Sequence, residues 1–191
     1  MTRSDSRLLL FALLASASLT VTAQVNLVPN GGFATDLGGW APSGEGTAVW
    51  SDVDIDDDTG SGSALLGNAE ATAGQRVYPL EACIVLGETG LHRIGASGMG
   101  LSGAASGRLV FSYSLRHAAD CTGGASAIGG LFLNSIDTWQ SVELSATAFS
   151  LPATIELRLG IEKDPAGGSF HGHFDDVYVI KDALIFANGF E

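Results

Sequence analysis

Two segments decide the fold of this chain: Asn26-Leu-Val-Pro-Asn-Gly-Gly-Phe33, which runs on to Gly39-Trp40, and Phe174-Asp-Asp-Val-Tyr-Val-Ile180. The first brings apolar residues, a Pro-Asn-Gly-Gly turn and a Gly-Gly-Trp plug together within fifteen positions. The second places two adjacent carboxylates at the head of an apolar strand. We expect these segments to form the first and last strands of one β-sandwich.

The residues between them indicate an all-β domain. Strict alternation of apolar and polar residues over 108–116 and 154–162 predicts two half-buried strands, each with a wet outer face. Tyr113 falls in register with the apolar positions, so we expect it in the core. Shorter strands are expected at 47–55, 63–67, 75–80, 91–97, 128–133, 139–147 and 170–180. This number of strands predicts two packed antiparallel sheets.

The start of the chain has the three zones of a secretory signal peptide. Arg3 and Arg7 give a positive start, 8–19 is apolar but too short to span a bilayer, and small residues precede a cleavage point after Ala23. We therefore expect a secreted protein, extracellular or periplasmic, with no membrane span in the mature chain. The expected organisation is a signal peptide at 1–23, a β-sandwich at 24–181 and a C-terminal tail at 182–191.

The charge of the chain limits its binding partners, and its cysteine content predicts a disulfide. The chain has 9 Lys and Arg against 21 Asp and Glu, a net charge of −12, which argues against nucleic acid as a partner. Cys83 and Cys121 are its two cysteines. In an exported chain they predict one structural disulfide, and closing that loop contributes about 4 kcal/mol to stability in the chain-entropy model.

Four motifs follow one another along the chain: NLVPNGGFATDLGGW at 26–40, SGSALL at 61–66, DTWQSVELSAT at 137–147 and FDDVYV at 174–179. In their order and spacing they resemble the bacterial CenC-like carbohydrate-binding modules, the family 4/9 type. The resemblance implies a jelly-roll β-sandwich of the galactose-binding-like kind. It also implies a polysaccharide or a cell-surface glycan as partner.

The resemblance implies a metal site as well. In that family a calcium ion commonly ties the first strand to the last, through a Glu after the phenylalanine of the first motif and a carboxylate of the Asp-Asp pair. Asp175 and Asp176 are therefore the expected calcium ligands, but Ala34 stands where the Glu would be. Calcium takes six to eight oxygens, so Asp36 and backbone carbonyls would have to compensate. The alternative is that one Asp caps a turn and the other is solvated.

Sugar binding in such modules depends on aromatic rings that face solvent and stack on a pyranose. The apolar residues of 47–55 that share one face are Val49, Val53 and Ile55. Trp50 then lies on the opposite face with Asp52 and Asp54, and we expect these three to bind carbohydrate. The alternative is that Trp50 packs over the edge of the sandwich. Trp40 and Trp139 are expected to be structural.

Catalysis has little support in the sequence. On a strand His171, His173 and Asp175 would share one face, a set that could hold a transition metal. However, Val177 and Val179 would continue the same face into the core. The chain has no Gly-x-Ser-x-Gly motif, and we do not expect an enzyme. Two functions remain: a secreted carbohydrate-binding protein, and a structural or adhesive extracellular β-sandwich without a sugar site.

Overall fold

The computed structural model describes residues 24–69, 75–164 and 168–182. Within these ranges no helix is long and apolar enough to cross a membrane. The strands are β1 (Ala41–Pro42), β2 (Thr47–Ser51), β3 (Ser63–Asn68), β4 (Arg76–Leu86), β5 (Gly90–Gly100), β6 (Gly107–Arg116), β7 (Ala125–Leu133), β8 (Gln140–Ala148), β9 (Ala153–Lys163) and β10 (Phe170–Lys181). Every strand expected between residues 47 and 180 is present, although β2 ends at Ser51 and most others are longer than expected.

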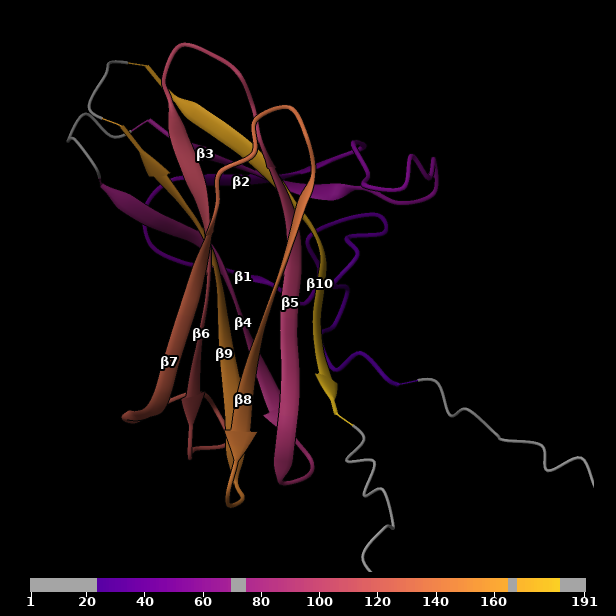
Figure 1. The fold of residues 1–191 in the computed structure, drawn as a ribbon, viewed down its shortest axis with the longest axis vertical. Helices are drawn as coiled ribbons and strands as arrows, with labels where there is room; N and C mark the ends of the chain where they lie inside the picture. Colours follow the sequence, from indigo (N-terminus) through magenta and orange to yellow (C-terminus); the bar gives the residue numbers. More distant parts are fainter. Residues whose placement is uncertain (1–23, 70–74, 165–167, 183–191) are drawn as a thin grey trace, which may run out of the picture.

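The strands form two five-stranded sheets that pack face to face (Figure 1). Sheet A has the order β1-β4-β9-β6-β7, and sheet B has the order β2-β3-β10-β5-β8. All pairings between these strands are antiparallel. The all-β, two-sheet antiparallel jelly-roll sandwich expected from the sequence is confirmed.

The core lies between the sheets and is filled by the alternating apolar residues of the central strands. From β6 and β9 these are Leu109, Phe111, Tyr113, Leu115, Ile155, Leu157, Leu159 and Ile161, all buried. Tyr113 keeps its hydroxyl satisfied by donating to the carbonyl oxygen of Ser145 at 3.1 Å. Each fully buried apolar side chain contributes about 1.5–3 kcal/mol. Because the side chains of the inner faces are buried in this core, a ligand can reach only the outer faces and the edges of the sheets.

The first signature segment lies beside β10, but it forms no strand. The Asn26 side chain donates to the carbonyl oxygen of Val177 at 2.9 Å and accepts the Val179 amide at 3.1 Å. The Leu27 amide donates to the carbonyl oxygen of Val179 at 2.8 Å. A Cβ at Gly31 would stand 2.0 Å from the Val177 oxygen, so this close approach needs glycine. The expectation of a first strand is wrong, whereas the juxtaposition of the two segments is present.

Two further structural expectations are met. Trp40 is buried against Phe33, with ring centroids 5.6 Å apart, as a plug at the end of the core. Cys83 of β4 and Cys121 of the β6–β7 connection form the expected disulfide, with their Cα atoms 5.8 Å apart. The disulfide holds that connection against sheet A. The connection in turn meets sheet A again through Gly123, whose carbonyl oxygen accepts from Nη1 of Arg116.

Strand β10 changes the face that it presents to the core part-way along its length. Its residues that point inward are Phe170, Phe174, Val177 and Val179. The pairing with β5 shifts register between Asp175 and Tyr178, and Asp176 has a φ of 48°. These are the signs of a β-bulge, in which one residue is extra. An unbroken alternation from His171 to Val179, as expected from the sequence, is therefore wrong.

Candidate functional site

Trp50 lies in β2, an edge strand of sheet B. Its indole ring is fixed by contacts with two other segments of the chain. Nε1 donates to the carbonyl oxygen of Phe33 at 2.7 Å, and a Cβ at Gly62 would stand 2.7 Å from Cζ2 of the ring. Trp50 is 38% exposed, whereas Val49, which was expected inside, is 53% exposed. The assignment of faces is wrong at Val49. Trp50 as a sugar-binding residue stays a prediction, with part of its ring covered.

Asp52 and Asp54 follow β2 in an acidic loop. Asp52 is exposed, while Asp54 is buried and its Oδ1 accepts the amides of Asp56 at 2.8 Å and Asp58 at 3.0 Å. Burial alone would raise the pKa of Asp54, but these hydrogen bonds outweigh it and lower the pKa. Asp54 therefore stabilises the turn formed by residues 54–58. That these residues bind carbohydrate stays a prediction.

The expected metal pair lies at the bulge of β10. Asp175 is buried, and its Oδ2 and Oδ1 accept the amides of Ile55 at 3.2 Å and Asp176 at 2.7 Å. Burial raises the pKa of Asp175 to about 7, and the charges of Asp176 and Asp54 add to the rise. No group of three or more His, Cys, Asp or Glu among the described residues is arranged to hold a metal. These carboxylates supply only part of what calcium requires, and calcium binding stays a prediction.

His173 precedes this pair on the outer face of sheet B. Its Nδ1 pairs with the Ser63 hydroxyl at 2.8 Å, and its ring lies against Trp139 with centroids 6.2 Å apart. The side chain is buried, and burial lowers its pKa. A neutral, packed imidazole in this setting is a structural group.

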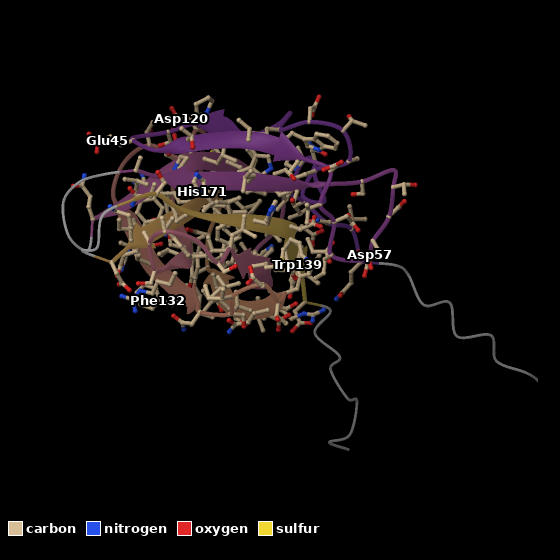
Figure 2. All side chains as sticks on the ribbon, turned by 90° about the horizontal axis from the view of Figure 1, so that it is seen from above. Glu45, Asp57, Asp120, Phe132, Trp139 and His171 are labelled. Atoms are coloured by element: carbon tan, nitrogen blue, oxygen red, sulfur yellow. A yellow bond between two sulfur atoms is a disulfide. The ribbon has the colours of Figure 1, made fainter. Side chains whose placement is uncertain are left out.

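A shallow groove lies on the outer face of sheet A, where neither Trp50 nor the acidic loop is found. It has a volume of about 530 Å³. Its lining includes Arg76, Tyr78, Val110, Ser112, Ser114, Arg116, Ile128, Phe132 and Arg158, from strands β4, β6, β7 and β9. In the view of Figure 2, Phe132 and Asp57 of the acidic loop lie on opposite sides of the molecule. The groove and the sequence-predicted sugar residues are therefore separate surfaces.

The floor of the groove follows one row across the sheet. Val110 pairs with Gly160 on one side and with Phe132 on the other. In β4 the register shifts at this level, so that Tyr78 and Pro79 together face Gly160. Such a bulge accommodates a proline, which has no amide for the ladder. The row therefore has an aromatic residue at each end, and Gly160 and Val110 lie between them.

Gly160 lets the ring of Tyr78 lie down on the sheet. A Cβ at this position would stand 2.6 Å from Cδ1 and 2.7 Å from Cε1 of Tyr78. At the other end of the row, Phe132 is 37% exposed on the edge strand β7. The Tyr78 ring is fixed by its packing over Gly160 and half-buried, and the part of it that remains exposed is suited to stacking on the apolar face of a flat ring.

Two arginine–glutamate–arginine triads flank this row. In the first, Glu162 of β9 binds Arg76 at 2.7 Å and Arg108 at 2.5 Å, each on a neighbouring strand. In the second, Glu156 of β9 binds Arg158 at 2.6 Å and Arg116 of β6 at 2.6 Å. Each arginine makes two hydrogen bonds to its glutamate. Both bonds of an arginine go to one carboxylate oxygen, and hydrogen bonds between two charged groups are stronger than neutral ones.

The triads and the aromatic rings are connected. The guanidinium carbon of Arg108 lies 3.6 Å from the centroid of the Phe132 ring, and that of Arg76 lies 5.0 Å from it. Burial alone would raise the pKa of Glu162, but hydrogen bonds and charge from these two arginines outweigh it and lower the pKa. Glu162 is therefore ionised at neutral pH, and both cations are held in place over the ring.

Sequence reasoning did not identify this groove. The alternation of 108–116 and 154–162 did place Arg116, Glu156, Arg158 and Glu162 on wet outer faces. The available signal was that arginines recur at outward positions on several strands of an otherwise acidic chain. Tyr78 gave no signal, because the bulge at the following proline determines where its ring lies.

The chain matches no protein-family model and no curated protein. Among solved structures it is similar to the carbohydrate-binding module TmCBM61 in complex with β-1,4-galactotriose, at 15% identity and a TM-score of 0.57 over 83% of this chain and 99% of that one. It is also similar to a family 4 carbohydrate-binding module, at 13% identity and a TM-score of 0.51 over 81% of this chain and 99% of that one.

A third similar structure is the enzymatically active domain of tailspike protein 4 from bacteriophage CBA120, at 18% identity and a TM-score of 0.60. The likeness covers 81% of this chain but 21% of that protein. At identities this low, the comparisons establish the β-sandwich fold. They extend over several carbohydrate-binding families and do not single out the family 4/9 type.

Proposed function

We propose that this protein is a secreted, non-catalytic carbohydrate-binding protein that holds a glycan in the groove on sheet A. One observation carries the proposal: the row from Tyr78 through Gly160 and Val110 to Phe132 places aromatic rings at both ends of a low, open floor. Sugar sites combine such rings with polar groups that fix the hydroxyls. Arg158 and Ser112 line the same groove and supply donors and acceptors.

The groove replaces β2 as the principal candidate for the sugar site. Trp50, with Asp52 and Asp54, is the second candidate, because the ring is 38% exposed. Its Nε1 is already engaged by Phe33, and Asp54 is engaged by its own turn. We also retain the distant relationship to the CenC-like family 4/9 type, export by the segment 1–23, and a structural calcium ion at Asp175 and Asp176. Segment 1–23 and tail 183–191 lie outside the described residues.

The test is affinity electrophoresis of the mature protein through gels that contain soluble polysaccharides, both neutral and acidic. We expect retardation by at least one of them, and Tyr78→Ala should reduce the affinity roughly tenfold, since a stacking contact of this kind contributes up to about 1.4 kcal/mol. Phe132→Ala on the exposed edge strand gives a second variant in case Tyr78→Ala alters the fold. Melting temperatures check the folding of each.

Tyr178→Ala is the matched control. Tyr178 lies on the outer face of sheet B over Gly95, where a Cβ would stand 2.3 Å from Cζ of its ring, just as Tyr78 lies over Gly160. Loss of binding with Tyr178→Ala or Trp50→Ala, but not with Tyr78→Ala, would place the site on sheet B and overturn the assignment. If no polysaccharide retards the wild type, the structural or adhesive alternative is the better account.

A further inference from the structure

The groove on sheet A has a charge opposite to that of the chain as a whole. Three of the five arginines among the described residues line it, and a fourth, Arg108, lies at its edge over the ring of Phe132, in a chain of net charge −12. Its carboxylates are Glu156 and Glu162, with Glu81 at 3.7 Å from Arg158. Each triad therefore keeps one positive charge in excess, and the groove remains positive even when Glu81 is counted.

The arginine side chains of the triads are more exposed to solvent than the glutamate side chains. The Glu156 and Glu162 side chains are 9% and 16% exposed, while those of Arg158, Arg108 and Arg76 are 41%, 39% and 37% exposed. The guanidinium groups are therefore the more accessible charged groups of the triads. A ligand that enters the groove therefore meets cationic hydrogen-bond donors first.

Donor capacity remains after the ion pairs are made. A guanidinium has five N–H donors in a planar fork. Arg108 and Arg158 each use Nε and Nη2 on a glutamate oxygen, and for neither does Nη1 have a hydrogen-bond partner among the described residues. One free arm on each triad is thus open to a ligand. The two N–H groups of Nη1 and the second N–H of Nη2 form the other edge of the guanidinium, and this edge matches the two oxygens of a carboxylate better than it matches a single hydroxyl.

We propose that the groove selects anionic glycans, and specifically chains of uronic acids, whose carboxylates bind Arg108 and Arg158. This inference rests on the proposed function and adds the substrate class. Sugar rings stack on Tyr78 between the triads, and their carboxylates face the guanidinium groups on either side. The two glutamates do not compete for the ligand, because their oxygens are occupied by arginine.

The spacing of the triads favours a chain over a single sugar. Arg108 lies opposite Glu162, so Arg158 and Arg108 are four residues apart along β9, which is about 13 Å on an extended strand. That distance exceeds one monosaccharide and requires a ligand with charges repeated along its length. The negative charge elsewhere does not prevent binding, because at physiological ionic strength charges farther than about 8 Å are largely screened.

The experiment compares an oligogalacturonate long enough to reach both triads with the same oligomer methyl-esterified, in which each negative charge is replaced by a neutral methyl ester. Isothermal titration of the mature protein should give at least about tenfold tighter binding of the acid, since a charge-assisted hydrogen bond contributes more than a neutral one. The advantage of the acid should shrink as salt is raised from 50 to 500 mM, roughly a tenfold range.

Arg108→Gln and Arg158→Gln test the two contacts without leaving a glutamate unpaired. Glu162 keeps Arg76 in the first variant, and Glu156 keeps Arg116 in the second. In each variant the ratio of the affinity for the acid to the affinity for the ester should fall to near one, and this ratio is the readout whatever the affinity for the ester becomes. The matched control is Arg93→Gln, an arginine of sheet B that pairs with Glu143 and should change neither affinity.

Each outcome has one meaning. Equal affinity for acid and ester, or a preference that both arginine variants retain, overturns the inference but leaves the proposed function intact, provided that a neutral glycan binds through Tyr78. Failure of every glycan to bind overturns both. Equal or tighter binding of dextran sulfate shows general attraction to polyanions and overturns the choice of uronic acids.

Discussion

Gly160 lies beneath the ring of Tyr78, where a Cβ would stand 2.6 Å from Cδ1 of the ring. The two residues belong to neighbouring strands of sheet A, and the bulge at Pro79 brings them to the same level. The absence of a side chain at position 160 thus determines how the groove is shaped. It is also the most direct point at which the proposed site can be altered.

Gly160→Ala should lift the Tyr78 ring from the sheet and weaken glycan binding about as much as Tyr78→Ala does, roughly tenfold. The measurement is affinity electrophoresis or titration with whichever glycan binds the wild type. Gly87→Ala is the control, since a Cβ there meets nothing within 4 Å. Unchanged affinity in Gly160→Ala would mean that the ring position is irrelevant to binding.

Glu156→Gln should destabilise the protein by about 1–2 kcal/mol, because it leaves two arginines facing each other, partly screened by solvent. Glu162→Gln should cost less, since its side chain is 16% exposed against 9% for Glu156. Urea unfolding at neutral pH measures both. Glu88→Gln removes an exposed partner of Lys181 and should cause no resolvable change. Equal stability of Glu156→Gln and wild type would contradict the role given to the triad.

Asp175 should make the metal-free protein less stable as pH rises. Its pKa is about 7 in the folded chain against 3.8 ordinarily, so the fold favours the neutral form. Its contribution is complete below pH 3.8 and is lost as pH rises through about 7, a difference of about 4 kcal/mol. Melting in the presence of a chelator, compared with Asp175→Asn, measures it. A variant with the same pH profile as wild type would contradict this prediction.

The same experiment tests calcium. If Asp175 and Asp176 bind the ion, added calcium at pH 8 should raise the melting temperature of the wild type, since a ligand of the folded state stabilises it. The Asp175→Asn variant should not respond. If neither calcium nor a chelator changes the melting temperature of the wild type, the protein does not bind a stabilising calcium ion at Asp175 and Asp176.

The double variant Cys83→Ala/Cys121→Ala should lose about 4 kcal/mol of stability, because a closed loop with a separation of 38 residues is opened in the unfolded chain. Denaturant unfolding under oxidising conditions measures the loss. A protein that is equally stable with and without the bridge would show that sheet A holds the β6–β7 connection without it.

The fold could be predicted from the sequence because its central strands alternate without interruption. Leu109 to Leu115 and Ile155 to Ile161 each keep a period of two, and the structure buries those residues as expected. Prediction was less successful at the edges. In β2 neither face is fully buried, so apolar Val49 is free to face solvent and gives no reliable guide to Trp50.

The groove could not be predicted from the sequence for a related reason. Tyr78 reaches it through a bulge, and the triads join residues of β4, β6 and β9 that are far apart in the chain. A pattern within one strand shows which side chains point outward. It does not show which strands are neighbours, and the pairing of Glu162 with two arginines depends on that order.

The bulge at Asp176 gives β10 one residue more than a simple alternation needs. Phe174 and Val177 both face the core although they are three positions apart, and the extra position lets two carboxylates stand side by side within an apolar strand. Removing one of these two aspartates would leave Phe174, Val177 and Val179 at alternate positions, so the core side of β10 should tolerate a single-codon deletion here. The same deletion placed beyond Val177 would have no extra residue to absorb it and would turn the end of the strand over.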